Sequence, residues 1–437
     1  MIVMLGSGKV AGEVLAIPSK SHLHRLLICA ALANDYTLIN CRNIEAEDIK
    51  ATIACLEALG ARIKNSVDGF VVRPIEYDKL PEVCVLPCNE SGSTFRFMLP
   101  IVCALGVTGI FQMEGRLPER PIAPLDAELT RKGITLSKPT PTTLRCEGKL
   151  EAGSYTLPGN VSSQYISGLL MALPLLKADS ILEITEDIQS ADYIEITLDV
   201  QREFGIEHPL SNQTYIVKGN GEYQGSKQRV LTADGDWSNG AFWLACGAMP
   251  EGNVTLKGLN PNSLQGDRRM ADIVSQIGAN LSWDGDEVTV TEGDRRAVNI
   301  DAGAIPDLIP VICAVLSVAK GTSVITNAGR LRIKESDRLA MTAKVLNTLG
   351  AKITEQEDGL IIEGVPALIG KSITVSVDAC NDHRIAMLAA VASISYSGRV
   401  VLTGAEAVNK SYPRLWDDFA KMVNYCFEVV RGHIDHE

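Results

Sequence analysis

Residues 18–32 read PSKSHLHRLLICAAL, a short polar segment that leads directly into an apolar helix. The apolar residues 14–17 before it are predicted to form a short strand. The polar segment therefore lies at a helix N-terminus, where backbone N–H groups lack partners and the helix dipole is positive. Lys20, Ser21 and Arg25 add an ammonium, a hydroxyl and a guanidinium to this end. Together these groups favour a site for a phosphate or a carboxylate, although basic residues also flank helices for solubility alone.

The same arrangement recurs along the chain at intervals of 70 to 76 residues. A second series consists of glycines that follow amphipathic helices, and each is a predicted C-cap in the left-handed conformation. A sixth such helix, at residues 416–422, lacks the glycine. Two series in register predict six copies of one repeat that contains two helices and alternating strands. The polar segments are residues 18–21, 88–91, 159–162, 235–238, 305–307 and 381–384, and the glycines are Gly60, Gly133, Gly205, Gly278 and Gly350.

The two helices of each repeat differ in character. The first is apolar on nearly all sides, and residues 308–316 (LIPVICAVL) are the clearest example. Such a helix is buried all round, so only its polar N-terminal end can meet a ligand. The second carries charges such as Glu57 and Lys132 and is expected to face water. If the buried helices lie parallel, several positive helix ends point into one cleft.

Length and composition limit the possible functions. The chain has 437 residues, a formal net charge of −12 and a pI near 5.1. This acidity argues against a general nucleic-acid binder and predicts that any anion site is a local basic cleft. Residues 1–11 show no secretory signal, and glycine, proline or charge interrupts every apolar run before it reaches membrane-spanning length. Most of the eleven cysteines lie in apolar runs, which indicates a reducing compartment and a cytoplasmic protein.

Two further segments combine charges with helix starts. Residues 332–338 (RIKESDR) form the densest charged cluster, and on a helix Lys334 and Arg338 would share a face. Glu335 beside these cations suits proton transfer, although the cluster by itself is better explained as a solvated, charged helix start. Residues 381–384 (NDHR) open another apolar helix, where Asp382 is expected to act as a cap and Arg384 to bind a ligand. No zinc-ligand spacing, Walker loop or Rossmann fingerprint is present.

Seven ordered motifs together resemble the 5-enolpyruvylshikimate-3-phosphate (EPSP) synthase family of enolpyruvyl transferases over essentially the whole chain. The resemblance implies an α/β fold of two domains, each of three βαβαββ repeats with buried parallel helices. It places the first domain at residues 18–234 and the second at residues 1–17 with 235–437, with the active site in the cleft between them. The motifs are residues 18–21 with Arg25, 119–122, 162–164, 305–307, 334–338 and 381–384, and Lys410.

The resemblance also implies a reaction and its residues. The family transfers the enolpyruvyl group of phosphoenolpyruvate to the 5-hydroxyl of shikimate 3-phosphate and releases phosphate, without a metal or cofactor. Asp307 resembles the group that accepts the hydroxyl proton, Glu335 the group that protonates the methylene carbon, and Lys20 is the third catalytic residue. We expect a monomer that binds neither nucleic acid nor membrane. Shikimate 3-phosphate is expected to contact Lys20, Ser21, Arg25, Ser162, Ser163, Gln164, Ser190, Asp307 and Lys334, and phosphoenolpyruvate to contact Lys20, Gly92, Arg120, Gln164, Arg338, Arg384 and Lys410.

Two positions depart from the family pattern, and two other interpretations remain open. Glu90 occupies the start of a run that commonly reads Asn-Ala-Gly-Thr before the arginine matching Arg96, and Arg330 stands where some members carry a substrate-binding Asn. The sister enzyme, UDP-N-acetylglucosamine enolpyruvyl transferase, shares the fold but usually has a reactive Cys in the loop at 116–120, where this chain has none. A non-catalytic anion-binding scaffold would have no use for Asp307 and Glu335 among the cations.

Overall fold

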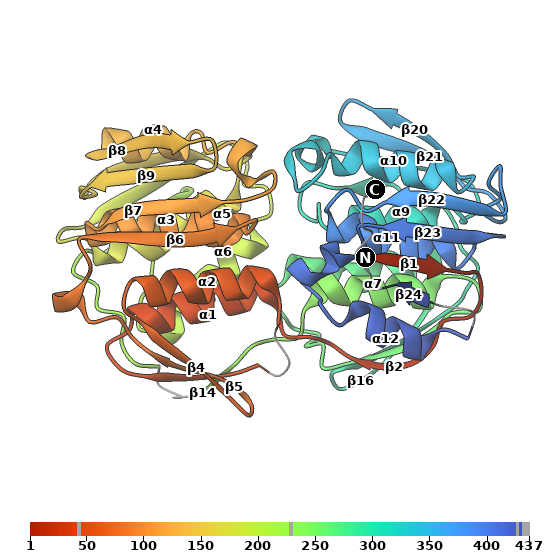
Figure 1. Cartoon of the computed structure of the whole chain (residues 1–437), viewed down its shortest axis with the longest axis horizontal. Coiled ribbons are helices and arrows are strands. Elements are labelled where there is room, and N and C mark those ends of the chain that lie inside the picture. The colour runs from red at the N-terminus through yellow and green to blue at the C-terminus, as the bar shows by residue number, and fades with distance from the viewer. Residues whose placement is uncertain (42–44, 227–229, 425–427, 431–437) are drawn as a thin grey trace, which may run out of the picture. The chain divides into compact units, whose positions relative to one another are not determined.

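The computed structural model describes residues 1–41, 45–226, 230–424 and 428–430 (Figure 1). The chain divides into two compact units. The inserted unit is Pro18–Ala233, and the terminal unit combines Met1–Ile17 with Asp234–Glu437. Each unit has a separate hydrophobic core.

The inserted unit contains three four-stranded sheets of one design. In each, the first two strands of the sheet order are parallel, and a hairpin adds the last two antiparallel strands. In two of the sheets a buried helix connects the parallel pair, whereas the third sheet takes one strand of the pair from the end of the unit. The sheets have the orders β14-β3-β5-β4, β6-β7-β9-β8 and β10-β11-β13-β12. The strands are β3 (Thr37–Asn40), β4 (Arg62–Ser66), β5 (Gly69–Arg73), β6 (Val83–Asn89), β7 (Thr108–Met113), β8 (Ile134–Thr140), β9 (Thr143–Gly148), β10 (Ser154–Pro158), β11 (Ser180–Thr185), β12 (Leu210–Ser211), β13 (Thr214–Val217) and β14 (Val230–Thr232).

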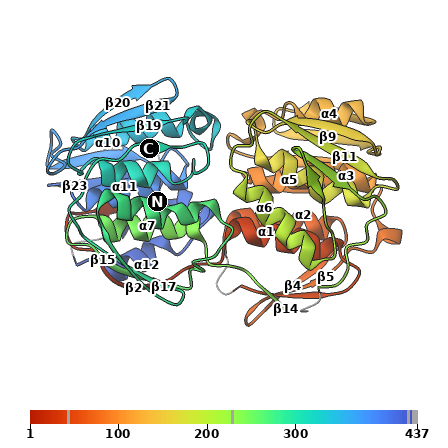
Figure 2. The same cartoon turned by 180° about the vertical axis from the view of Figure 1, so that it is seen from behind.

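Six α-helices pack against these sheets in the described part of the unit. The first helix of each repeat is almost wholly buried, and these are α1 (Lys20–Leu32), α3 (Gly92–Leu105) and α5 (Ser163–Ala172). Each second helix keeps one exposed face, and these are α2 (Glu47–Ala58), α4 (Leu125–Arg131) and α6 (Asp192–Glu203). Helices α1 and α2 lie side by side in both views, and α3 packs against α5 (Figures 1 and 2).

The terminal unit repeats the design, but the first strands of the chain complete two of its sheets. Strand β1 (Ile2–Leu5) lies between β23 and β24, and β2 (Ala11–Leu15) pairs parallel with β15. The orders are β16-β17-β15-β2, β18-β19-β21-β20 and β22-β23-β1-β24. The remaining strands are β15 (Asn253–Lys257), β16 (Asn280–Asp284), β17 (Glu287–Thr291), β18 (Ile300–Asp301), β19 (Thr322–Thr326), β20 (Lys352–Gln356), β21 (Gly359–Glu363), β22 (Thr374–Asp378), β23 (Arg399–Thr403) and β24 (Glu428–Val430).

The helices of the terminal unit follow the same rule. Figure 2 shows α7 and α11 side by side within this unit, and α9 packs against both. The buried helices are α7 (Trp237–Ala248), α9 (Ile309–Leu316) and α11 (His383–Ser393). The outer helices are α8 (Arg269–Ile277), α10 (Arg338–Thr348) and α12 (Leu415–Met422).

The predicted α/β fold of three βαβαββ repeats per unit is confirmed. Each predicted polar segment leads into a buried helix, namely α1, α3, α5, α7, α9 and α11. The five predicted C-cap glycines all have positive φ angles, of 105, 93, 76, 112 and 96° for Gly60, Gly133, Gly205, Gly278 and Gly350. The sixth outer helix, α12, ends instead at an extended Val423. Local chain chemistry therefore marks both ends of the repeat.

The structure corrects two expectations from the sequence and adds detail to two others. The prediction of a helix that carries both Lys334 and Arg338 is wrong. Asp337 caps α10 by accepting a hydrogen bond from Ala340 N, so the helix begins only at Arg338. The first predicted strand lies at Ala11–Leu15 rather than at residues 14–17. The cysteines within the described ranges are buried free thiols, apart from the half-buried Cys380. Among the described residues, no helix combines the length and apolarity needed to cross a membrane.

Candidate functional site

In the inserted unit, Lys20 stands at the start of α1 as predicted. Ser19 caps the helix by accepting a hydrogen bond from His22 N at 3.3 Å. The Lys20 ammonium forms an ion pair of 2.6 Å with Asp48 of α2, and the two side chains are only 19% and 12% exposed. A cation is therefore held at the positive end of α1, with Asp48 fixing its direction. Sequence reasoning missed Asp48, whose position in an acidic first turn resembles an ordinary helix start.

Arg25 lies one turn further into α1 and is 1% exposed. Its Nε donates to Thr197 Oγ1 at 2.6 Å, and its two Nη atoms donate to the carbonyls of Ser21 at 2.6 Å and Tyr193 at 2.8 Å. The guanidinium also stacks over Phe97, 4.9 Å from the ring centroid. Burial lowers the pKa of Arg25 to about 10, so the side chain stays charged at neutral pH. Its positive charge faces neutral partners in these contacts.

The segment that leads into α6 lies beside Arg25 and contains Ser190, two residues before the helix begins. This residue is 3% exposed and has a φ of 56°, the left-handed conformation that non-glycine residues rarely adopt. Its carbonyl accepts a hydrogen bond from Tyr193 N at 3.2 Å. Tyr193 also accepts from Arg25, so the predicted residues Arg25 and Ser190 belong to one connected region.

Two arginines meet at the start of α3. A Cβ added to Gly92 would lie 2.8 Å from Arg120 Nη1 and 2.9 Å from Arg96 Nη1, so only glycine fits without displacing a guanidinium. Arg96 Nη1 donates to Gln164 Oε1 at 2.8 Å, and Gln164 Nε2 donates to Ser93 Oγ at 2.9 Å. The structure thus joins the predicted Gly92, Arg120 and Gln164.

Arg96 completes this group and was not predicted as a site residue. The sequence signal was its position four residues after Gly92 in α3, which turns both toward one side of the helix. Its guanidinium also lies 5.7 Å from the ring centroid of Tyr165, in α5. Arg96 therefore connects the beginnings of two buried helices.

The start of α5 supplies hydroxyls without charge. Ser162 caps the helix by accepting from Gln164 N at 3.3 Å, and Ser163 is 5% exposed. These contacts hold two predicted hydroxyl residues beside Gln164. Glu90, the departure from the family pattern, packs against the backbone of the loop that precedes Arg120, because a Cβ on Gly115 would lie 2.6 Å from its carboxyl carbon.

In the terminal unit, Arg338 is the centre of a charged cluster. Its side chain is 1% exposed and donates to three carboxylates. The distances are 2.6 Å to Asp307 Oδ1, 2.6 Å to Glu335 Oε2 and 2.8 Å to Asp382 Oδ2. Lys334 Nζ lies 3.4 Å from the same Asp307 oxygen. The structure therefore gathers the predicted Asp307, Lys334, Glu335 and Arg338 although the helix expected for them is absent.

Asp382 anchors this cluster to α11. It is fully buried, caps the helix by accepting from Arg384 N at 2.9 Å, and accepts from Ser336 Oγ at 2.9 Å. The predicted structural cap is confirmed. With the Arg338 contact, one carboxylate joins the segment before α10 to the start of α11.

The cluster shifts the acid–base properties of its members. Burial raises the pKa of Asp307, but the positive charges of Lys334, Arg338 and Arg384 outweigh burial and hold it well below its usual range. Burial lowers the pKa of Lys334, and this outweighs the opposite effect of Asp307. Asp307 is therefore ionised at neutral pH, and its weak basicity is a consequence of the cations around it.

Arg384 and Lys410 lie near the same end of α11. Arg384 Nη1 donates to the carbonyl of Ser238 at 2.7 Å, and its Nη2 donates to the Ser238 hydroxyl, which connects α11 to α7. Lys410, at the end of the 3-10 helix η6 (Ala405–Lys410), donates to the carbonyl of Asn381 at 2.7 Å. Both cations thus lie beside residues 381–384, as their motifs require.

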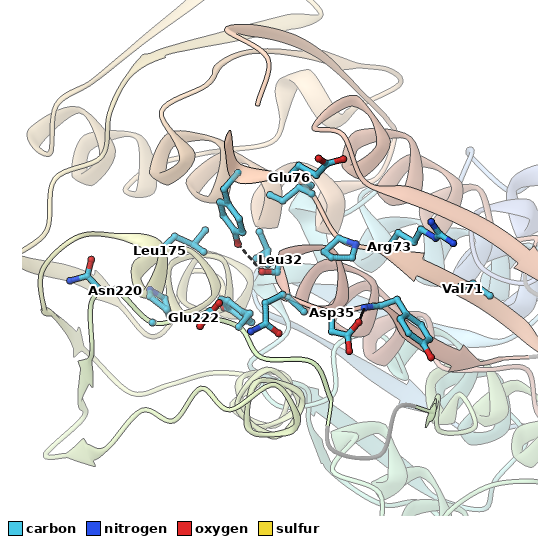
Figure 3. A pocket seen from close by; sticks show the side chains of 17 residues that line it. Leu32, Asp35, Val71, Arg73, Glu76, Leu175, Asn220 and Glu222 are labelled. Carbon is cyan, nitrogen blue, oxygen red and sulfur yellow. Dashed lines mark hydrogen bonds between the residues drawn. The ribbon is translucent and has the colours of Figure 1, made fainter. Parts of the chain in front are cut away.

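A cavity of about 980 Å³ in the inserted unit lies elsewhere (Figure 3). Leu32 at the C-terminal end of α1 lines it together with Asp35, Arg73 and Glu222, and Tyr77 donates a hydrogen bond of 2.7 Å to the Leu32 carbonyl. None of the predicted site residues lines this cavity. Since Lys20 begins α1 and Leu32 ends it, the cavity and the predicted site occupy opposite ends of one helix.

Comparisons with known proteins agree with this arrangement. Residues 5–419 match the family model described as EPSP synthase (3-phosphoshikimate 1-carboxyvinyltransferase). The chain belongs to the EPSP synthase family. The predicted family is thereby confirmed, and the match extends over nearly all of both units.

Individual relatives support the same family. A 3-phosphoshikimate 1-carboxyvinyltransferase of Clostridium beijerinckii is 41% identical over 95% of this chain and 96% of its own. The enzyme of the same name from Clostridium acetobutylicum is 40% identical over 94% and 95%. Among solved structures, an EPSP synthase from Acinetobacter baumannii has a TM-score of 0.79 at 23% identity and covers 98% of this chain and 100% of its own. At that identity the likeness supports the EPSP synthase fold.

Proposed function

We propose that this chain transfers the enolpyruvyl group of phosphoenolpyruvate to the 5-hydroxyl of shikimate 3-phosphate. The products are 5-enolpyruvylshikimate 3-phosphate and phosphate, in the shikimate pathway to chorismate and the aromatic amino acids. The single observation that carries the proposal is the cluster in which Asp307 and Glu335 share Arg338 beside Lys334. In an anion-binding scaffold, two carboxylates beside the cations would weaken the binding of an anion. Addition to a double bond, by contrast, requires both a base and an acid.

The proposed chemistry assigns one step to each carboxylate. Asp307 accepts the proton of the 5-hydroxyl as the oxygen attacks C2 of phosphoenolpyruvate, and Glu335 protonates the methylene carbon. The resulting tetrahedral intermediate then loses phosphate and one methyl proton, which restores the double bond. Lys20, Arg120 and Arg338 are suited to stabilise the phosphate and carboxylate charges throughout.

The depressed pKa of Asp307 fits this role once substrates are bound. Lys334 and Arg338 hold that pKa down in the ligand-free unit. When these cations pair with substrate anions, their effect on Asp307 weakens and its basicity rises. Substrate binding would therefore create the base at the moment it is needed.

We assign shikimate 3-phosphate mainly to residues of the inserted unit, and phosphoenolpyruvate together with the catalytic carboxylates mainly to the terminal unit. Both units would act on the same pair of substrates in a shared cleft. The division follows the chain, because Lys20, Arg25, Ser162 and Gln164 belong to one unit and the Arg338 cluster to the other. We further propose a cytoplasmic monomer that binds neither nucleic acid nor membrane. The net charge of −12 argues against binding to nucleic acid.

Phosphate release tests the proposal directly. The purified chain is mixed with phosphoenolpyruvate and shikimate 3-phosphate, and phosphate is measured over time. Parallel reactions omit shikimate 3-phosphate or replace it with UDP-N-acetylglucosamine. Release that requires shikimate 3-phosphate is expected. Release with UDP-N-acetylglucosamine instead would identify the sister activity, and binding of both ligands without release would identify a scaffold.

A further inference from the structure

Four buried polar side chains form a hydrogen-bonded chain behind the predicted anion site of the inserted unit. His24 Nδ1 lies 2.7 Å from Thr52 Oγ1, Thr52 Oγ1 lies 2.7 Å from Thr94 Oγ1, and Thr94 Oγ1 lies 2.7 Å from Ser91 Oγ. Each of the four residues is at most 1% exposed. Polar groups are costly to bury unless they are paired, so the continuity of the chain needs an explanation.

This hydrogen-bonded chain of side chains connects three helices close to their N-terminal ends. His24 follows Lys20 by one turn of α1, and Thr52 follows Asp48 by one turn of α2. Thr94 lies in the first turn of α3, two residues after Gly92, and its hydroxyl donates to the Asp48 carbonyl at 3.2 Å. The chain therefore ties together the starts of the helices that carry Lys20, its ion-pair partner Asp48, and Gly92.

One assignment of the protons satisfies every hydrogen bond among these side chains. Burial, Lys20 and Arg25 lower the pKa of His24 well below its usual value, so the ring is neutral at pH 7. His24 Nε2 is buried without a hydrogen-bond partner. A proton on Nε2 would therefore be unsatisfied, and the proton belongs on Nδ1, which donates to Thr52. Thr52 then donates to Thr94, and Thr94 donates to the Asp48 carbonyl.

Ser91 completes this pattern from the other side. Its Oγ accepts from Thr94 N at 3.2 Å as the helix cap, which leaves its proton for Thr94 Oγ1. Each hydroxyl proton thus has an acceptor, and Thr94 Oγ1 receives two hydrogen bonds while donating one. Removing the Thr52 hydroxyl would leave the His24 Nδ1–H without an acceptor and would break the side-chain link from His24 through α2 to Thr94.

We propose that His24, Thr52 and Thr94 are positioning residues that fix α1, α2 and α3 against one another and so hold Lys20 and Asp48 in place beside Gly92. This inference rests on the proposed function, since Lys20 and Gly92 are assigned to substrate binding there. None of the three touches substrate in this proposal. They act through the Lys20–Asp48 ion pair and the backbone at the start of α3.

The kinetic test uses three variants of buried threonines. Thr52→Val removes the hydroxyl and keeps the branched shape, whereas Thr52→Ser keeps the hydroxyl. Thr37→Val is the matched control, because Thr37 is fully buried in β3 of the same unit and its hydroxyl has no hydrogen-bond partner. Turnover, KM for both substrates and thermal unfolding are measured for each. Circular dichroism verifies that each variant is folded.

Thr52→Val is expected to lower kcat/KM by about 10- to 100-fold, since displacements near 1 Å in an active site have effects of that size. Thr52→Ser is expected to recover most of the loss, and Thr37→Val to match the unmodified chain. A folded Thr52→Val variant within twofold of the unmodified kcat/KM would overturn the positioning role. Equal losses in Thr52→Val and Thr37→Val would overturn it too, because the effect would then reflect general repacking.

A spectroscopic test is independent of activity. The chain has six histidines, so ¹⁵N-histidine labelling gives few resonances, and a His24→Gln variant identifies the one from His24. The neutral Nδ1–H form is expected from pH 6 to 8 and should be lost in Thr52→Val. A charged ring or an Nε2–H form would overturn the hydrogen-bonded chain. If the unmodified protein shows the Nδ1–H form but releases no phosphate, the proposed function fails while the chain of hydrogen bonds stands.

Discussion

The two units build the same buried helices but cap them differently. In the inserted unit, serine hydroxyls cap α1, α3 and α5, through Ser19, Ser91 and Ser162. In the terminal unit, carboxylates of Asp236 and Asp382 cap α7 and α11, and α9 has no side-chain cap. A hydroxyl leaves the positive helix end available to a ligand, whereas a carboxylate neutralises it. One fold can therefore attract anions through helix ends or, where these are neutralised, through arginine and lysine.

The buried arginines show the same contrast. Arg25 and Arg338 are each 1% exposed. Arg25 donates to two hydroxyls and two carbonyls, while Arg338 donates to three carboxylates. Burial lowers the pKa of Arg25, whereas Asp382, Glu335 and Asp307 outweigh burial and raise the pKa of Arg338. Arg25 keeps an unneutralised charge, and Arg338 can bind an anion only after a carboxylate has moved or taken up a proton.

The largest expected effect comes from removing the carboxylate cap of α11. Asp382→Ala removes one of the three carboxylates around buried Arg338 and leaves the Ser336 hydroxyl and the start of α11 without their acceptor. We therefore expect a loss of about 3–5 kcal/mol of stability, typical of breaking a buried ion pair. Chemical denaturation followed by circular dichroism measures it. The paired variant Ser91→Ala in the inserted unit should cost about 1 kcal/mol, the usual value for a helix cap. Equal losses would remove the contrast between the two kinds of cap.

The next largest effect is expected on turnover. Glu335→Gln keeps a hydrogen-bonding side chain near Arg338 but cannot transfer a proton, so kcat should fall by about 10²-fold or more while ligand binding persists. Steady-state kinetics and calorimetry measure the two quantities. Glu355→Gln is the control, because Glu355 forms a partly exposed ion pair with Arg332 in the same unit. Near-normal turnover in folded Glu335→Gln would remove this carboxylate from the mechanism.

In the inserted unit, Lys20→Ala is expected to weaken the binding of both substrates. Loss of a charged hydrogen bond should cost about 1.5–3 kcal/mol for each ligand. The variant also leaves Asp48 without its ion-pair partner, so Lys20→Ala/Asp48→Asn separates loss of the cation from the uncompensated carboxylate. Isothermal titration calorimetry provides the affinities. A change in the affinity for one substrate alone would contradict a position between two anions.

Cooperation between the units is expected to be of similar or smaller size. If both units contribute to one site that closes over the ligands, shikimate 3-phosphate should raise the affinity for phosphoenolpyruvate by a coupling free energy of about 1–3 kcal/mol. Calorimetry with and without shikimate 3-phosphate measures this coupling, and small-angle scattering measures compaction. Glyphosate, the inhibitor associated with this family, offers a second probe. Equal affinities without compaction would disprove closure even for an active enzyme.

The smallest effect tests the capping contrast at one residue. Ser162→Ala should cost about 1 kcal/mol of stability, because Gln164 N loses its acceptor. Ser162→Asp should restore the stability, since a carboxylate caps equally well, but should lower the affinity for shikimate 3-phosphate more than Ser162→Ala does. Thermal unfolding and calorimetry measure the two properties. Undiminished affinity in Ser162→Asp would show that the free helix end does not attract the ligand.

The sequence predicted features that depend on local chemistry. Gly60 and its four counterparts have positive φ because the end of each outer helix requires it, and this is visible in a few residues. Uniformly apolar helices such as α9 were recognisable for a similar reason. Because these local features recur in six repeats, together they predicted the fold.

Features that depend on distant partners were not predictable from the sequence. Asp382 lies 44 positions from Arg338 in the sequence, and no local pattern predicts that one guanidinium will bind three carboxylates. The spacing of Lys334 and Arg338 suited one helix, but Asp337 caps α10 and so starts the helix after Lys334. The sequence did not assign Arg96 to the site, because its hydrogen bond to Gln164 and its approach to Gly92 exist only after folding.

The place of β1 has a consequence for the order in which the protein can be made. Ile2 lies opposite Thr403 in the register of one sheet, so β1 pairs with a strand that is synthesised much later. The inserted unit, by contrast, draws all its strands from residues between Pro18 and Ala233. During synthesis it can fold while the terminal unit is still incomplete. The growing chain must therefore keep β1 without this partner until β23 has been synthesised.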